Sequence, residues 1–103
     1  MKLITEEFEE LFKDYPLYSQ EKSKDPLVIA KLFDPTGSAT WYLTEYCPER
    51  KLAFGYVKGL CEGGDELGYI SMEELESLEQ HGIIIERDIY FQSKNLSQIV
   101  NRN

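Results

Sequence analysis

Apolar side chains near the start of the chain recur at helical spacing. Phe8, Leu11 and Phe12 fall at positions i, i+3 and i+4, so they lie on one face of a helix. A threonine that can cap the helix precedes them, and glutamates fill the first turn, where negative charge favours the helix dipole. The pattern predicts a helix over residues 5–13, which must end before Pro16.

From residue 26 onward the pattern changes to that of strands. Runs rich in β-branched and aromatic residues are separated by turn sequences, of which Asp-Pro-Thr-Gly at 34–37 is the clearest. Because side chains alternate between the faces of a strand, Glu45 is predicted to share a face with Trp41 and Leu43. Tyr46 is then predicted on the opposite face. The runs predict strands over residues 27–33, 39–46, 52–60 and 67–70.

A capping box marks the start of a second helix. Ser71 is followed three residues later by Glu74, and Gly82 supplies the residue type that commonly ends a helix. These signals predict a helix over residues 71–81. After it, a run of isoleucines predicts a short buried strand or extended segment, and Asn95 can cap a last helical turn.

The predicted elements define an α+β fold, an antiparallel meander of about four strands that carries two main helices. With 103 residues, of which 42% are apolar, the chain fits a single domain over residues 1–103. No apolar run approaches the roughly 18 residues of a membrane span, and the acidic N-terminus does not resemble a signal peptide. We therefore expect a cytoplasmic protein.

Both cysteines are expected to be reduced thiols. Cys47 lies beside a predicted turn, and Cys61 lies at the far end of the next predicted strand, roughly 30 Å away at about 3.3 Å per residue. A disulfide requires Cα atoms within about 7 Å of each other. Reduced cysteines agree with a cytoplasmic location.

The charge balance restricts the partners of the protein. The chain carries 19 acidic and 11 basic residues, for a net charge of −8. This balance argues against direct binding to nucleic acid or to anionic membranes, and it is compatible with a basic partner protein.

The acidic residues cluster on the two predicted helices. Acids spaced i, i+3 lie about 5–6 Å apart on a helix, near the spacing of backbone phosphates, so they can compete with nucleic acid for a basic groove. The alternative is that they form only the solvated sides of amphipathic helices. The acids concerned are Glu6, Glu7, Glu9 and Glu10 in the first helix and Glu73, Glu74, Glu76 and Glu79 in the second.

The sequence predicts neither a catalytic nor a metal-binding constellation. His81, the single histidine, ends the second predicted helix, where its cation would complement the helix dipole, and no serine or cysteine is placed beside it. The acidic loop over residues 62–66 lacks the alternating ligands of a calcium loop, and no phosphate-binding glycine motif opens a helix. We therefore predict a protein that is not an enzyme and uses no cofactor or metal.

Aromatic residues on the predicted strands are the best candidates for a binding surface. Because neighbouring side chains on a strand point to opposite faces, they cannot all enter one core. Tyrosines on an open sheet face suit recognition, whereas helices that cover this face would bury them. An uncovered face would also favour a homodimer. The candidates are Trp41, Tyr42, Tyr46, Tyr56 and Tyr69.

Several short motifs occur in a specific combination along the chain. They are Leu-Tyr-Ser-Gln at 17–20, Lys-Leu-Phe-x-Pro-x-Gly at 31–37, Thr-Trp-Tyr-x-Thr-Glu at 40–45, Phe-Gly-x-Val-x-Gly at 54–59, Glu-Leu-Gly-Tyr-x-Ser-x-x-Glu-Leu at 66–75 and Ile-Glu-Arg-Asp-x-x-Phe at 85–91. Together they resemble a bacterial family known as domain of unknown function 2958. The resemblance implies a small protein or module of plasmids, conjugative elements or phages, and it supplies no catalytic residues.

Arg87 lies between two acids in the last of these motifs. An arginine in this position can form an internal ion pair that fixes a loop. The alternative is a role in binding.

These observations lead to two main expectations about function. The first is a non-enzymatic protein-interaction module of a mobile element that counters a host defence system. It would act through an acidic surface that includes Glu73 and Glu76, and its partner would be a basic, nucleic-acid-handling protein. The second is a small-ligand or nucleotide-binding module with a pocket lined by Trp41, Tyr42, Tyr56 and Tyr69. A third possibility, a hydrolase, would require His81 beside a nucleophile.

Overall fold

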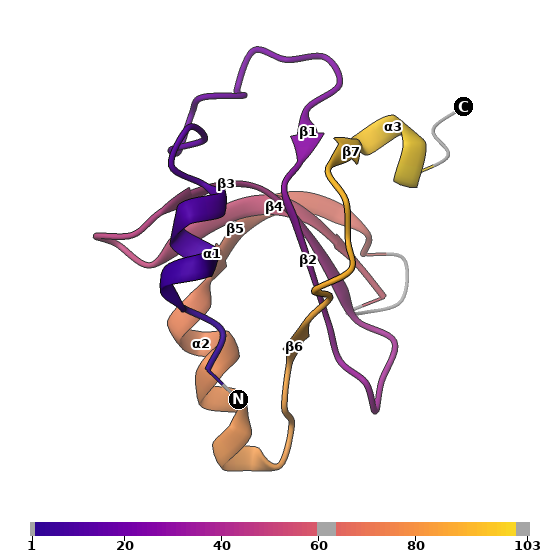
Figure 1. The fold of residues 1–103 in the computed structure, drawn as a ribbon. Helices are drawn as coiled ribbons and strands as arrows, with labels where there is room; N and C mark the ends of the chain where they lie inside the picture. Colours follow the sequence, from indigo (N-terminus) through magenta and orange to yellow (C-terminus); the bar gives the residue numbers. More distant parts are fainter. Residues whose placement is uncertain (1, 60–63, 101–103) are drawn as a thin grey trace.

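A computed structural model describes residues 2–59 and 64–100 of the protein. Its centre is an antiparallel sheet of five strands in the order β5-β4-β3-β2-β6, with two helices on one of its faces (Figure 1). The expected α+β class and the antiparallel meander are confirmed, although the sheet has one strand more than predicted. The five strands are β2 (Ala30–Phe33), β3 (Thr40–Cys47), β4 (Leu52–Lys58), β5 (Glu66–Ser71) and β6 (Glu86–Arg87).

Both helices begin where the capping signals predict. The side chain of Thr5 accepts a hydrogen bond from the backbone N–H of Phe8 at the start of α1 (Glu6–Leu11). The side chain of Ser71 does the same for Glu74 at the start of α2 (Met72–Ser77), which continues as a 3-10 helix, η1 (Leu78–His81). Gly82 ends this helix with a φ of 82°, a conformation that glycine adopts readily.

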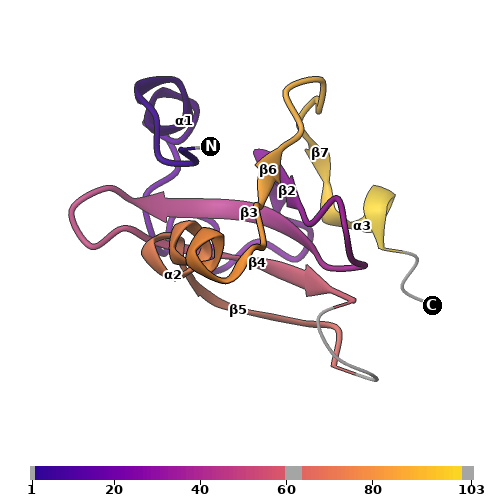
Figure 2. The ribbon, with the colours of Figure 1, turned by 90° about the horizontal axis from the view of Figure 1, so that it is seen from below.

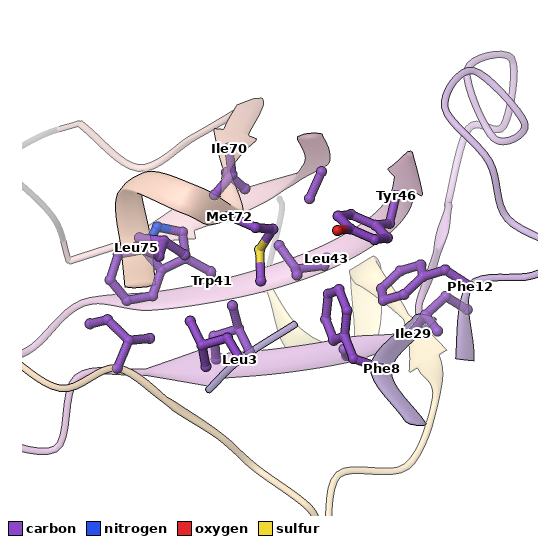
Figure 3. Packing of buried hydrophobic residues seen from close by; sticks show 14 of the residues in the cluster. Leu3, Phe8, Phe12, Ile29, Trp41, Leu43, Tyr46, Ile70, Met72 and Leu75 are labelled. Atoms are coloured by element: carbon purple, nitrogen blue, oxygen red, sulfur yellow. The ribbon is translucent and has the colours of Figure 1, made fainter. Parts of the chain in front are cut away.

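The main core lies between the helices and the sheet (Figure 3). The ring centroid of Tyr46 lies 4.9 Å from that of Phe8 and 5.9 Å from that of Phe12, so β3 is packed against α1. Met72 and Leu75 bring α2 onto the same face of the sheet. These contacts define the helix face of the sheet; the opposite side is the second face.

A β-bulge in β3 changes which side chains reach the helix face. The pairing of β3 with β4 shifts between Leu43 and Glu45, so the alternation of side chains reverses at Thr44. The prediction that Glu45 shares a face with Trp41 is therefore wrong. Tyr46 joins Trp41 in the main core, and Glu45 lies on the second face.

The C-terminal segment covers part of the second face. The short strand β7 (Lys94–Asn95) pairs with β1 (Leu27–Val28), and α3 (Leu96–Ile99) follows it. The predicted cap of this last helical turn is confirmed, because Asn95 and the side chain of Gln98 form a capping box. Leu96 is buried in a second, smaller cluster on this side.

Some predictions fall outside the described residues or are only partly matched. Cys47 is a half-buried free thiol, whereas Cys61 and part of the 62–66 loop lie outside the described residues. In the isoleucine run, Ile85 is buried and Ile84 is exposed, and the segment is extended without being a strand. None of the described helices is long and apolar enough to cross a membrane.

A candidate binding cleft on the second face

A cleft opens on the second face between the loop that follows α1 and strands β3, β4 and β5. Its volume is about 340 Å³, near the lower end of the range of roughly 300–1,000 Å³ that is typical of ligand pockets. We call it the tyrosine cleft. The lining residues that matter below are Tyr18, Gln20, Glu21, Glu45, Phe54, Leu67 and Tyr69.

Glu45 lies in the floor of the cleft and holds the loop that forms one of its walls. Its side chain is only 4% exposed, and its two oxygens accept hydrogen bonds from the backbone N–H of Tyr18 at 2.8 Å and of Gln20 at 2.9 Å. Hydrogen bonds to a carboxylate are about twice as strong as those between neutral groups. They hold Tyr18 in the left-handed region, with a φ of 73°, which a residue other than glycine adopts infrequently.

Gln20 joins the loop to two strands through its side-chain amide. Its Nε2 donates to the carbonyls of Leu27 and Thr44, each at 2.8 Å. Its Oε1 accepts from the backbone N–H of Leu27 at 2.6 Å. The amide thus connects β1 to β3 through hydrogen bonds with the backbone of both strands. The floor of the cleft is therefore held by hydrogen bonds from Gln20 as well as from Glu45.

Two tyrosines form the rim of the cleft. The side chain of Tyr18 is 53% exposed and that of Tyr69 is 55% exposed. A side-chain hydrogen bond with Tyr18 is the main cause that raises the pKa of Tyr69 above its usual value. Phe54 supports Tyr69 from the neighbouring strand, with ring centroids 5.1 Å apart. Large aromatic surfaces are therefore presented to solvent in a defined arrangement.

The structure separates the aromatic residues that the sequence grouped. Trp41 and Tyr46 lie in the main core under the helices, 4% and 1% exposed, so neither reaches the surface. Tyr42 and Tyr56 are cross-strand partners on the second face, next to the C-terminal segment. Of the five candidates, Tyr69 is the one that lines the tyrosine cleft. Trp41, Tyr42, Tyr56 and Tyr69 do not meet in one pocket, because Trp41 points away from the other three.

The acidic residues of the helices have different surroundings. Glu73 is exposed on α2. Glu76 is half-buried, and one of its oxygens accepts hydrogen bonds from the backbone N–H groups of Leu3 at 2.8 Å and Ile4 at 3.0 Å. Glu76 therefore anchors the N-terminal segment.

Arg87 forms an internal ion pair, as one of the two sequence interpretations expects. Its partner is Glu7 on α1 rather than either of the flanking acids, and its side chain is only 16% exposed. The pair joins α1 to β6 at the edge of the sheet.

The described residues contain no arrangement that resembles a metal site or a catalytic dyad. No group of three or more His, Cys, Asp or Glu side chains in this part of the chain is placed to hold a metal ion. His81 is exposed at the end of η1, and no serine or cysteine within residues 2–59 and 64–100 is hydrogen-bonded to it.

Tyr18, Gln20 and Glu45 were not predicted as site residues. Tyr18 and Gln20 lie in a segment that reads as extended chain and polar loop, and only the folded chain brings this segment over the sheet. The available signal was a glutamate between residues that are otherwise suited to a buried strand. A charge in such a place requires hydrogen-bonding partners from elsewhere in the fold.

The fold and the cleft together define a small α+β protein with an aromatic cavity on one face of its sheet. The chain belongs to a family described as "Protein of unknown function (DUF2958)", whose model matches residues 3–102. The resemblance seen in the sequence motifs is thereby confirmed over nearly the whole chain. Comparison with curated proteins and with solved structures gives no match.

Proposed function

We propose that this protein is a non-catalytic module that binds a segment of a partner protein in the tyrosine cleft. The observation that carries the proposal is the pair of exposed tyrosines over a cavity whose floor is fixed by a buried carboxylate. Tyrosine provides a large contact area at a low cost in conformational entropy, and it is frequent among the residues that dominate binding energy.

Charge favours a basic partner. The chain has a net charge of −8, and the residues that line the cleft include two acids, Glu21 and Glu45, against one base, Lys24. A lysine or arginine side chain is attracted both by carboxylates and by the faces of aromatic rings such as Tyr18 and Tyr69. We therefore infer a partner segment that carries basic side chains.

The wider role that we propose is that of an interaction protein of a mobile element, acting against a host system that handles nucleic acid. The resemblance and the acidic charge support this role. Binding of the partner at the cleft is a better mechanism for this role than mimicry of nucleic acid by the acidic helices. Glu7 and Glu76 on these helices already have partners within the chain. Glu10 likewise pairs with Lys13 at 2.9 Å.

Affinity capture with matched tyrosine variants tests the proposal. Nuclease-treated host lysate would be passed over the wild type, Tyr69→Ala and Tyr90→Ala, at low salt and at about 0.3 M salt, where exposed charge pairs are strongly screened. Tyr90 is 86% exposed and lies outside the cleft, so it controls for the loss of an exposed tyrosine. A protein retained by the wild type and Tyr90→Ala but lost from Tyr69→Ala supports the proposal. Equal capture by all three contradicts it.

The volume of the cleft, about 340 Å³, favours a second candidate, a module that binds a small ligand or nucleotide. A ligand present at 100 times its dissociation constant adds about 2.7 kcal/mol to the free energy of unfolding. Thermal-shift screening of nucleotides and metabolites would therefore detect such a ligand. A shift that occurs in the wild type and is absent in Tyr69→Ala would favour this candidate over a protein partner, and no shift with any compound counts against it.

A further inference from the structure

We infer that the outer edge of β5 binds an extended, basic segment of the partner protein as an added antiparallel strand, so that its side chains enter the tyrosine cleft. This inference rests on the proposed function, because it specifies how the partner reaches the cleft. Proteins commonly recognise extended peptides in this way, with affinity from main-chain hydrogen bonds and specificity from pockets for alternate side chains.

β5 forms one border of the sheet and pairs with β4 alone (Figure 2). Within the described part of the chain, no backbone group of residues 67–70 is hydrogen-bonded to any segment other than β4. In an antiparallel edge strand, alternate N–H and C=O groups point away from the sheet and can pair with another strand. The edge carries no proline and no lysine, which are residues that proteins use to prevent such pairing.

Gly68, in the middle of β5, is not explained by the fold. A Cβ atom at this position would have no other atom within 4 Å, and its φ does not lie in the region that favours glycine. Gly55, its partner on β4, is different, because a Cβ there would lie 2.2 Å from the carbonyl oxygen of Tyr42. Glycine inside a strand weakens it and often marks a place where another backbone approaches closely. The space around Gly68 is open, so the backbone of β5 is accessible to an added strand at this point and would also accept a small side chain.

Acidic side chains flank the edge at both ends. Asp65 and Glu66 lie at its start, and Glu73 and Glu74 lie just beyond its end in the first turn of α2. All four are exposed, and none forms an ion pair with another described residue. Between them, Leu67 and Tyr69 are 38% and 55% exposed on the second face. This pattern matches a strand with an apolar middle and with lysine or arginine towards its ends.

The same charges disfavour a second copy of this chain as the added strand. Antiparallel pairing of two β5 strands about a two-fold axis would place the acidic start of one beside the acidic end of the other. Like charges opposite each other in a sheet are destabilising. A basic partner removes this repulsion and replaces it with attraction.

Selection from a phage-displayed library of random ten-residue peptides on the immobilised protein tests the inference. We expect enriched peptides that alternate apolar and polar residues and carry basic residues near their ends. Binding of the enriched peptides would then be compared in the wild type, Gly68→Ala and Gly68→Lys. Both substitutions fit the open space at this position, so circular dichroism and thermal melting should show a folded protein in each case.

Gly68→Ala should bind within about twofold of the wild type, because the edge stays open. Gly68→Lys should bind at least about tenfold more weakly, because a lysine on an edge strand disfavours pairing with another strand and would lie beside the apolar middle of the partner segment. Enrichment of acidic peptides, or no enrichment at all, overturns the inference. So does a dimer of the wild type in light scattering that Gly68→Lys abolishes, because the occupant of the edge is then a second copy.

The outcomes separate this inference from the proposed function. If Tyr69→Ala loses the peptides while Gly68→Lys keeps them, the cleft is a binding site and strand addition is wrong. If the peptides bind Tyr69→Ala and Gly68→Lys as tightly as they bind the wild type, both statements are wrong.

Discussion

Glu45 is the residue on which the geometry of the cleft depends most. Its buried oxygens accept two backbone hydrogen bonds from the loop, so the isosteric change Glu45→Gln places an amide N–H₂ against one of these donors. We expect a loss of about 1–3 kcal/mol in the free energy of unfolding, the usual cost of leaving a buried group without a partner. Urea denaturation would measure it. The control Glu49→Gln, in an exposed turn, should change stability by less than about 0.5 kcal/mol.

Tyr46 supplies a prediction about alkaline pH. Burial, with a further contribution from nearby carboxylates of which Glu9 is the first, raises its pKa to about 12. Since the tyrosines of the unfolded chain titrate near about 10, the folded chain holds this proton more tightly between these pH values. The free energy of unfolding should therefore fall as pH rises from about 10 to about 12.

The variant Tyr46→Phe isolates this effect. The Tyr46 hydroxyl has no hydrogen-bond partner among the described residues, so its removal should leave stability at pH 7 unchanged or raised. The difference in stability between the variant and the wild type should grow in favour of the variant as pH rises from 10 to 12. A constant difference across this range, measured by urea denaturation, would contradict the prediction.

At the scale of single elements, local signals were sufficient for some parts of the fold and not for others. The helix starts followed from side chains within three residues, namely Thr5 before Phe8 and Ser71 before Glu74. Strands β6 and β7 have two residues each, which is too short for any periodicity, and they form only because β2 and β1 are available to pair with them. The bulge at Thr44 leaves no local signal either, yet it decides that Tyr46 is core and Glu45 is not.

The C-terminal segment should be essential to the stability of the whole fold. Leu96 is 1% exposed and packs with Val28 and Tyr56 on the second face. We expect Leu96→Ala to lower the free energy of unfolding by about 2–5 kcal/mol, through lost burial and the cavity left behind. The control Leu11→Ala removes a side chain that is 38% exposed and should cost clearly less. A cost for Leu96→Ala no greater than that of the control would show that the segment is only loosely attached.

For the molecule as a whole, the two faces of the sheet divide the roles. The helix face carries the main core, and the second face is closed by the C-terminal segment on one side and open at the tyrosine cleft on the other. The sequence left open whether strand tyrosines line an exposed sheet face or are covered, and in the structure Tyr69 is exposed. The sequence could not predict which ones are exposed, because the choice depends on Glu45 drawing the distant Tyr18 loop over β4 and β5.

The position of the acidic residues around the molecule distinguishes the cleft from a general acidic surface. Glu73 and Glu74 lie beside the end of β5, whereas Glu6 and Glu10 lie on α1, which Glu7 joins to Arg87 at the opposite edge of the sheet.

If the partner binds at the cleft and at β5, the double substitution Glu73→Lys with Glu74→Lys should weaken binding several-fold and reduce its dependence on salt, because attraction to a basic segment is lost there. Reversal of Glu6 and Glu10 together changes the net charge equally and should leave binding within about twofold. Titration of the captured partner at two salt concentrations would measure both effects. An equal loss in both double variants would instead favour recognition of the overall negative charge, the mechanism expected of a nucleic-acid mimic.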